Sequence, residues 1–245
     1  MVNEAGPMKA SDPAGPPLGT GELECATASR VPRVVPSYWV IAIASTVLGT
    51  VGSDVFAVQG GLGYGANLLV FLALFLIVLR LKLSARRHGP LAYWVLFTAS
   101  AMVGTTGFGF IDRVFSLGYA SGSGLLALFL VVILALWYEN QEPSRSVERV
   151  QTASDEAIYW VAFLVANTLG TSASHFLSRE LGIGVMQRAI LIGGLLLLAA
   201  LAHRLTKLSS AFWFWTAVVL TRPLGAAFAA MLVESPVKGG LSLGA

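Results

Sequence analysis

The amino-acid sequence predicts an all-α integral membrane protein with about seven transmembrane helices, built from parallel internal repeats that form two similar halves. Of its 245 residues, 56% are hydrophobic and only 12% are charged, too few charges to cover a water-soluble surface. Apolar runs of roughly 17 to 25 residues recur, the length that a helix needs to cross a hydrocarbon core about 30 Å thick. The expected spans are Ser37–Phe56, Ala66–Leu83, Leu91–Phe110, Gly124–Trp137, Ala157–Phe176, Met186–Ala202 and Ala211–Val233.

The segment before the first span is expected to be a disordered cytoplasmic tail, residues 1–35, followed by a transmembrane domain over residues 36–245. It contains Pro, Gly, Ser, Ala and mixed charges, and it lacks the basic start and apolar stretch of a cleavable signal peptide. The first span would then act as the insertion signal. The single cysteine, Cys25, lies in this tail, so no internal disulfide and no thiolate metal site are expected.

The basic residues predict the orientation of the chain. The net charge of +3 does not indicate a nucleic-acid partner, because the Lys and Arg residues gather at the ends of the apolar runs. The positive-inside rule therefore predicts a multi-pass protein of the cell (inner) membrane, with its N-terminus in the cytoplasm and its C-terminus outside. The side assigned to the cytoplasm carries Lys9, Arg30, Arg33, Arg80, Lys82, Arg86, Arg87, Arg145, Arg149, Arg204 and Lys207, and the other side carries Arg113, Arg179 and Lys238.

A short pattern opens every second span. YWVIAIASTVLG begins at Tyr38 and recurs as YWVLFTASAMVG at Tyr93, YWVAFLVANTLG at Tyr159 and FWTAVVLTRPLG at Phe214. The terminal glycines are 55, 66 and 55 residues apart. This spacing predicts four units, about 37–83, 91–138, 157–206 and 211–245, and each two-span unit begins on the same side of the membrane. The fourth unit is expected to lack a second span.

The tryptophan and the glycine of each copy have different expected roles. An amphipathic indole at the start of a span favours the headgroup boundary, and ten residues further on, about 15 Å, the glycine lies near the bilayer midplane. A midplane glycine allows a neighbouring helix to approach closely. Glycine-rich segments at 60–65, 116–124, 180–184 and 239–244 are expected to be the turns on the outer side. The predicted interface anchors are Trp39, Trp94, Trp160 and Trp215, and the predicted packing glycines are Gly49, Gly104, Gly170 and Gly225.

These repeats, with TVLGTVGSD, VGTTGFGFIDR, LGTSASHFL and TRPLGAAFAAMLVESPVKGGLSLG, resemble an uncharacterised bacterial family of integral membrane proteins with four tandem repeats of unknown function. The resemblance covers roughly Ser37 to the end, and the chain looks like a divergent, C-terminally shortened member. The family pattern implies an acidic residue five positions after the midplane glycine. Only the first unit keeps it, because that position reads Asp54, Gly109, His175 and Ala230.

Polar residues inside the spans are the candidates for function. Seven positions after the tryptophan the units carry Thr46, Ala101, Asn167 and Arg222. A guanidinium at this depth costs about 2.5 to 3.5 kcal/mol, so Arg222 is expected to face the bundle interior. It would either bond to the carbonyls freed by Pro223 or to Asn167, or line a substrate or ion pathway. Asp54 and His175 are expected near the outer ends of their spans, as a proton or cation relay or as helix caps.

The leading functional hypothesis is a small-solute or ion transporter whose path is lined by Asp54, Asn167, His175 and Arg222. The alternative is a non-transporting scaffold or accessory subunit. No catalytic motif is found, so no enzyme activity, catalytic residue, cofactor or metal site is expected. The expected partners are the lipid bilayer and a small ion or solute, with a homo-oligomer left open.

Overall fold

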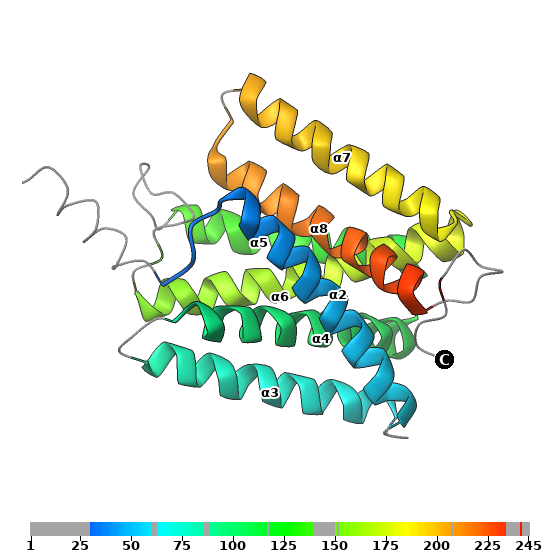
Figure 1. Ribbon diagram of the computed structural model, residues 1–245. Helices are drawn as coiled ribbons and strands as arrows, with labels where there is room; N and C mark the ends of the chain where they lie inside the picture. Colours follow the sequence, from blue (N-terminus) through cyan, green and yellow to red (C-terminus); the bar gives the residue numbers. More distant parts are fainter. Residues whose placement is uncertain are drawn as a thin grey trace, which may run out of the picture.

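The structure is a computed structural model that describes residues 30–59, 63–85, 89–116, 118–139, 150, 152–206, 208–233 and 241. These residues form seven long α-helices and one short π-helix (Figure 1). The helices are α2 (Pro36–Gln59), α3 (Tyr64–Ser84), α4 (Pro90–Phe115), α5 (Gly118–Glu139), α6 (Ala153–His175), η1 (Phe176–Glu180), α7 (Val185–Leu205) and α8 (Ser210–Val233).

Six of the seven long helices are long and apolar enough to cross a membrane, and α6 is the exception among the described residues. Its first turn carries Asp155 and Glu156, and polar side chains such as Asn167 lie within it. The helix packs against α4, α5 and α8, so it meets protein over much of its surface. A helix enclosed by other helices does not need an apolar surface facing lipid, which explains its composition.

The helices are arranged as an inner ring with an outer layer. The four helices that open the units, α2, α4, α6 and α8, are called the inner helices, and each packs against the next until α8 meets α2. The outer helices α3, α5 and α7 pack chiefly on the inner helix of the following unit: α3 on α4, α5 on α6 and α7 on α8. Among the described residues, no outer helix packs on α2 in the way that α3, α5 and α7 pack on the other inner helices. The four units therefore interlock through a closed ring of inner helices.

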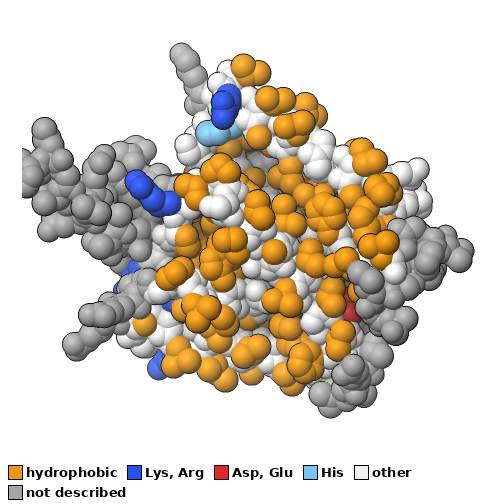
Figure 2. All heavy atoms as spheres, in the orientation of Figure 1, with side chains coloured by type: hydrophobic (Ala, Val, Ile, Leu, Met, Phe, Trp, Pro, Cys, Tyr) orange, Lys and Arg blue, Asp and Glu red, His pale blue; other side chains and the backbone are white. Residues whose placement is uncertain are grey.

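The surface has the character expected for a lipid-facing protein. Hydrophobic side chains cover the face shown in Figure 2, while the visible Lys and Arg side chains gather at the end where the inner helices begin. This end, called the leading end, includes Arg30 and Arg33 before α2 and Arg204 at the end of α7. The distribution agrees with the charge asymmetry read from the sequence, and a cytoplasmic leading end stays a prediction.

One predicted turn is mostly helix. Segment 116–124 was expected to reverse the chain, but α4 continues to Phe115 and α5 already begins at Gly118. Ser116 takes a left-handed conformation (φ 50°) that ends α4, and Gly118, the first residue of α5, has a φ of +70°. The smallness of Gly122 therefore serves packing rather than a turn, because a Cβ there would lie 3.0 Å from the Phe108 ring.

The other predicted turns and the tail fall partly or wholly outside the described residues. After η1, Gly182 adopts a φ of +64° that a side chain would strain, so segment 180–184 does reverse the chain. The predicted tail lies outside the description up to residue 29, as do residues 60–62 and almost all of 234–245. The turn that was expected at 239–244 falls in those residues, apart from Leu241.

The tryptophan positions differ from the expectation of four lipid-interface anchors. Trp160 is fully buried and Trp215 is 4% exposed, both inside the hydrophobic core of the bundle. Their place as interface anchors is therefore wrong in these two copies, because neighbouring helices cover the rings before lipid can reach them. Trp39 and Trp94 are half-buried and pack against the same core, so an anchoring role stays a prediction for them.

Candidate functional site

The inner helices meet through the two columns that the repeats define. The glycine ten residues after each tryptophan faces the residue seven positions after the tryptophan on the next inner helix. The spacing is so close that an added Cβ would overlap its neighbour at three of the contacts and would make a tight contact at the fourth, that of Gly104. That Cβ would lie 2.6 Å from Ala101 Cβ for Gly49, 3.0 Å from Asn167 Cβ for Gly104, 2.7 Å from Arg222 Cγ for Gly170 and 2.7 Å from Thr46 Cβ for Gly225.

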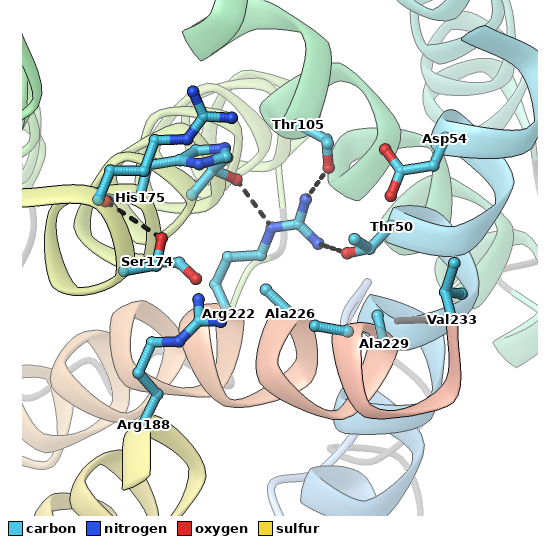
Figure 3. Close-up of a pocket in the computed structure, with 14 residues that line it drawn as sticks. Thr50, Asp54, Thr105, Ser174, His175, Arg188, Arg222, Ala226, Ala229 and Val233 are labelled. Atoms are coloured by element: carbon cyan, nitrogen blue, oxygen red, sulfur yellow. Dashed lines mark hydrogen bonds between the residues drawn. The ribbon is translucent and has the colours of Figure 1, made fainter. Parts of the chain in front are cut away.

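Arg222 projects from α8 into the middle of this ring and is 1% exposed. Its guanidinium makes five hydrogen bonds, which reach all three of the other inner helices, and Figure 3 shows the three that go to hydroxyl groups. Nε donates to Thr171 Oγ1 (3.3 Å), Nη1 to Thr46 O (3.4 Å) and Thr50 Oγ1 (3.1 Å), and Nη2 to Ala101 O (2.6 Å) and Thr105 Oγ1. The five N–H groups of the guanidinium are thus matched by five oxygen acceptors.

The three threonines that receive Arg222 occupy one column of the repeat, eleven positions after the tryptophan, and are called the threonine collar: Thr50, Thr105 and Thr171. Each hydroxyl donates its hydrogen to the carbonyl one turn earlier, at 2.9, 3.0 and 3.0 Å respectively. The hydroxyl oxygens therefore offer lone pairs to the guanidinium. The fourth unit has Ala226 in this column, which leaves room for the side chain of Arg222.

A cavity of about 280 Å³ lies beside the threonine collar and is called the central cavity (Figure 3). Its charged lining residues are Asp54, Arg179, Arg188 and Arg222. His175 also lines it, and Ala226, Ala229 and Ala230 of α8 form a wall with short side chains. Figure 3 shows Asp54 on α2 at one side of the Arg222 guanidinium, and His175 and Arg188 at the other.

The four predicted pathway residues divide into two groups. Asp54, His175 and Arg222 line the same cavity, although they are as much as 168 residues apart in the chain (222 − 54). Asn167 is not part of the lining. Its Nδ2 donates to Ser100 Oγ at 2.8 Å, which joins α6 to α4, and its expected bond to Arg222 is replaced by the threonine collar. The prediction of Asn167 as a pathway residue is not supported by this position.

Two arginines of the cavity were not singled out as site residues by sequence reasoning. Arg188 belongs to the first turn of α7 and is 8% exposed, and Arg179 belongs to η1. An arginine within the sixth apolar run was the available signal for Arg188. The π-helix directly after His175 could not be read from the sequence. Such segments are rare and are found frequently at functional sites.

The leading end of the inner ring is closed by four aromatic side chains, one from each inner helix, called the aromatic collar. Its members are the residues before each tryptophan: Tyr38, Tyr93, Tyr159 and Phe214. All four are buried, and Tyr93 OH lies 2.8 Å from Tyr38 OH and 2.7 Å from Tyr159 OH. The Phe214 ring centroid is 6.3 Å from that of Tyr38 and 6.4 Å from that of Tyr159. The repeated aromatic before tryptophan was the sequence signal for this collar.

A buried ionic cluster adjoins the aromatic collar. Glu156 is fully buried, with Arg30 Nη1 at 2.9 Å from its Oε2 and Lys82 Nζ in contact with its Oε1. Lys82 Nζ also donates to Arg30 O at 3.0 Å and lies 5.9 Å from the Tyr93 ring centroid. The cluster ties the segment before α2 to α3 and α6. Sequence reasoning counted Lys82 and Arg30 only as basic helix ends.

Comparison with known proteins identifies the repeat. Residues 37–88 and 158–209 each match the Repeat of Unknown Function DUF347, which corresponds to the first and third units of the chain. No curated protein and no solved structure matches. The predicted all-helical membrane fold with internal repeats is thereby confirmed, and the inner helices of the second and fourth units pack in the same ring. This protein is a polytopic membrane protein that contains two copies of the DUF347 repeat of unknown function.

Proposed function

We propose that the protein is a permease for a small polar solute or ion, whose path runs inside the ring of inner helices. The observation that carries this proposal is the central cavity, which brings Asp54, His175 and Arg222 around an open volume of about 280 Å³. Charged groups within spans are costly, and they mark substrate or ion pathways when they face a cavity. Packing alone would be better served by apolar side chains that fill the space.

The two ends of the inner ring support a pathway with one closed side. The central cavity lies on one side of Arg222, where Asp54 is exposed. Toward the leading end, the side chains of Leu96, Phe97 and Phe163 are buried, and the aromatic collar follows. A binding cavity next to a packed barrier is the arrangement that alternating access requires, because opening and closing must happen on opposite sides of one site.

The alternative is a scaffold or accessory subunit in which Arg222 joins helices and nothing passes. The observation in its favour is that all five guanidinium N–H groups already have protein acceptors on three helices. Such a connection stabilises one arrangement of the ring. In a permease the same bonds would have to exchange partners when the cavity changes sides, so the two proposals differ in whether water ever reaches the layer beneath Arg222.

Cysteine labelling tests this difference. In a Cys25→Ser background, Ala230→Cys reports the central cavity, Ser100→Cys reports the layer between Arg222 and the aromatic collar, and Leu128→Cys is a lipid-facing control with 61% exposure. A permease predicts fast reaction of Ala230→Cys with a water-soluble maleimide and slower, measurable reaction of Ser100→Cys. If Ser100→Cys reacts no faster than Leu128→Cys while Ala230→Cys is labelled, the scaffold proposal replaces the permease.

A further inference from the structure

We propose that the central cavity binds a small oxyanion, held by Arg188 and Arg179 above the buried charge of Arg222. This inference rests on the proposed function and names the substrate class of that permease. Carboxylate, phosphate and sulfate share the required chemistry, because each presents oxygen atoms that a guanidinium can bind in pairs.

The charge of the lining is the first argument. Among the described residues that line the cavity, three arginines face one carboxylate, Asp54, which gives a formal charge of +2 (3 − 1) with His175 neutral. Arg188 and Arg222 are both buried between helices, where two like charges repel one another more strongly than in water. A cleft lined by one sign of charge raises the local concentration of the opposite ion. An anion in the cavity would lower this repulsion.

The role of Arg222 is to supply charge. Its five hydrogen bonds all go to neutral oxygens, three hydroxyls and two carbonyls, so they satisfy its N–H groups and leave its positive charge uncompensated by a bonded carboxylate. Asp54 is exposed at the edge of the cavity, on α2. Arg222 therefore contributes a fixed positive charge to the cavity lining, and other side chains must donate the hydrogen bonds to a ligand.

Arg188 and Arg179 are placed to supply those bonds. Arg188 reaches the cavity from the first turn of α7, and Figure 3 shows its side chain directed toward Arg222 and Ser174. Arg179 comes from η1, and its guanidinium carbon lies 5.9 Å from the Tyr119 ring centroid. Both belong to the lining of the same cavity as His175. Arg188 is 8% exposed and is the more enclosed donor, while Arg179 is exposed and offers a second guanidinium from another element.

The size of the cavity restricts the ligand. A volume of about 280 Å³ with a wall of alanines on α8 holds a small anion with some of its hydration water. A cation would meet three like charges and a single carboxylate, so the same lining disfavours it. The sign of the charge is thus the most direct property to test.

The binding test uses the purified full-length protein in detergent, with thermal unfolding measured against sodium phosphate, sodium sulfate and sodium acetate. Sodium chloride at equal ionic strength is the reference. We expect at least one oxyanion to raise the unfolding midpoint in a saturable way, since a ligand that binds only the folded state stabilises it. Absence of a saturable rise with all three oxyanions would overturn the inference.

Variants connect the response to the cavity. Arg188→Gln should weaken the apparent affinity about tenfold, the effect of losing roughly 1.4 kcal/mol of charge-assisted hydrogen bonding. Arg204→Gln, the same substitution at the exposed far end of α7, should leave it unchanged. Asp54→Asn should tighten binding by removing the opposing negative charge, whereas a cation site would be weakened by it. If Arg188→Gln does not fold, Arg179→Gln gives the same comparison from η1.

Binding and transport can fail separately. If an oxyanion binds but is not taken up by proteoliposomes, and Ser100→Cys stays unlabelled, the permease is refuted while the anion site stands. If Ser100→Cys is labelled but Asp54→Asn and Arg188→Gln leave the anion response unchanged, the anion site is refuted while the pathway stands.

Discussion

Replacing Gly225 by alanine should destabilise the protein, although alanine is the better helix former. A Cβ on Gly225 would lie 2.7 Å from Thr46 Cβ, where ordinary contacts begin at 3.4 Å, so the helices must separate by about 0.7 Å (3.4 − 2.7). Thr46 Cβ is fixed to the α2 backbone and cannot swing away. Because α8 also carries Arg222, the shift would stretch the bonds from its guanidinium to the threonine collar.

The expected cost is about 1–3 kcal/mol, the usual range for overpacking a core. For a chain of this size it lowers the unfolding midpoint by about 2–4 °C per kcal/mol. The matched control is Gly194→Ala in α7, where no atom lies within 4 Å of the added Cβ. There the gain in helix propensity, at most about 0.5–1 kcal/mol, should leave stability unchanged or slightly raised.

The assay is thermal unfolding in one detergent, with Thr46→Ser as a rescue. This change removes the threonine methyl group that faces Gly225, so the double variant should recover part of the loss, and the coupling energy measures the contact directly. Equal stability of Gly225→Ala and Gly194→Ala would refute the argument that midplane glycines set the spacing of the ring. So would the absence of any coupling to Thr46→Ser.

Three further results are expected. Tyr93→Phe should lower the free energy of unfolding by about 1–3 kcal/mol, which is about twice the loss from Tyr38→Phe. The reason is that Tyr93 OH takes part in two hydrogen bonds of the aromatic collar and Tyr38 OH in one. Equal losses in thermal unfolding would contradict this. Glu156→Gln should lower the free energy of unfolding by about 3–5 kcal/mol, because it leaves Lys82 buried without a carboxylate. Adding Lys82→Met should restore part of that stability. A double variant no more stable than Glu156→Gln alone would argue against the pairing. A reporter active only in the cytoplasm should work when inserted at residue 145 and fail near Gly182, and the reverse pattern would invert the predicted orientation.

The repeat pattern and the membrane-spanning helices could be predicted from the sequence, because both depend on the spacing of residues within one stretch of chain. A helix rises by a constant amount of about 1.5 Å per residue, so a glycine ten positions after a tryptophan lies at the same depth relative to it in every copy. The shared contacts of all four glycines follow from that regularity. The cavity residues Asp54 and His175 were also found this way, as equivalent positions in two halves of the chain.

Partner choice could not be read from the sequence, because it depends on how helices from different units meet. Asn167 and Arg222 occupy the same column, yet Asn167 bonds to Ser100 and Arg222 spans the ring. Trp160 was expected to lie at the lipid interface, but the outer helices pack against neighbouring units and its ring is buried. Arg188 enters the cavity only because α7 packs on α8.

Local periodicity thus determined which residues lie at which depth, and on which helix face a glycine or hydroxyl column runs. The four inner helices close into a ring, and this closure decides which residues of different units touch. Each glycine contacts the residue seven positions after the tryptophan of the next inner helix, a threonine hydroxyl accepts from the guanidinium, and tyrosine hydroxyls bond to one another. The physical reason is that depth is set along one helix, whereas a contact needs the position and rotation of two. A cavity lined by Asp54, His175 and three arginines requires at least four helices to be placed at once, and only the tertiary structure does that.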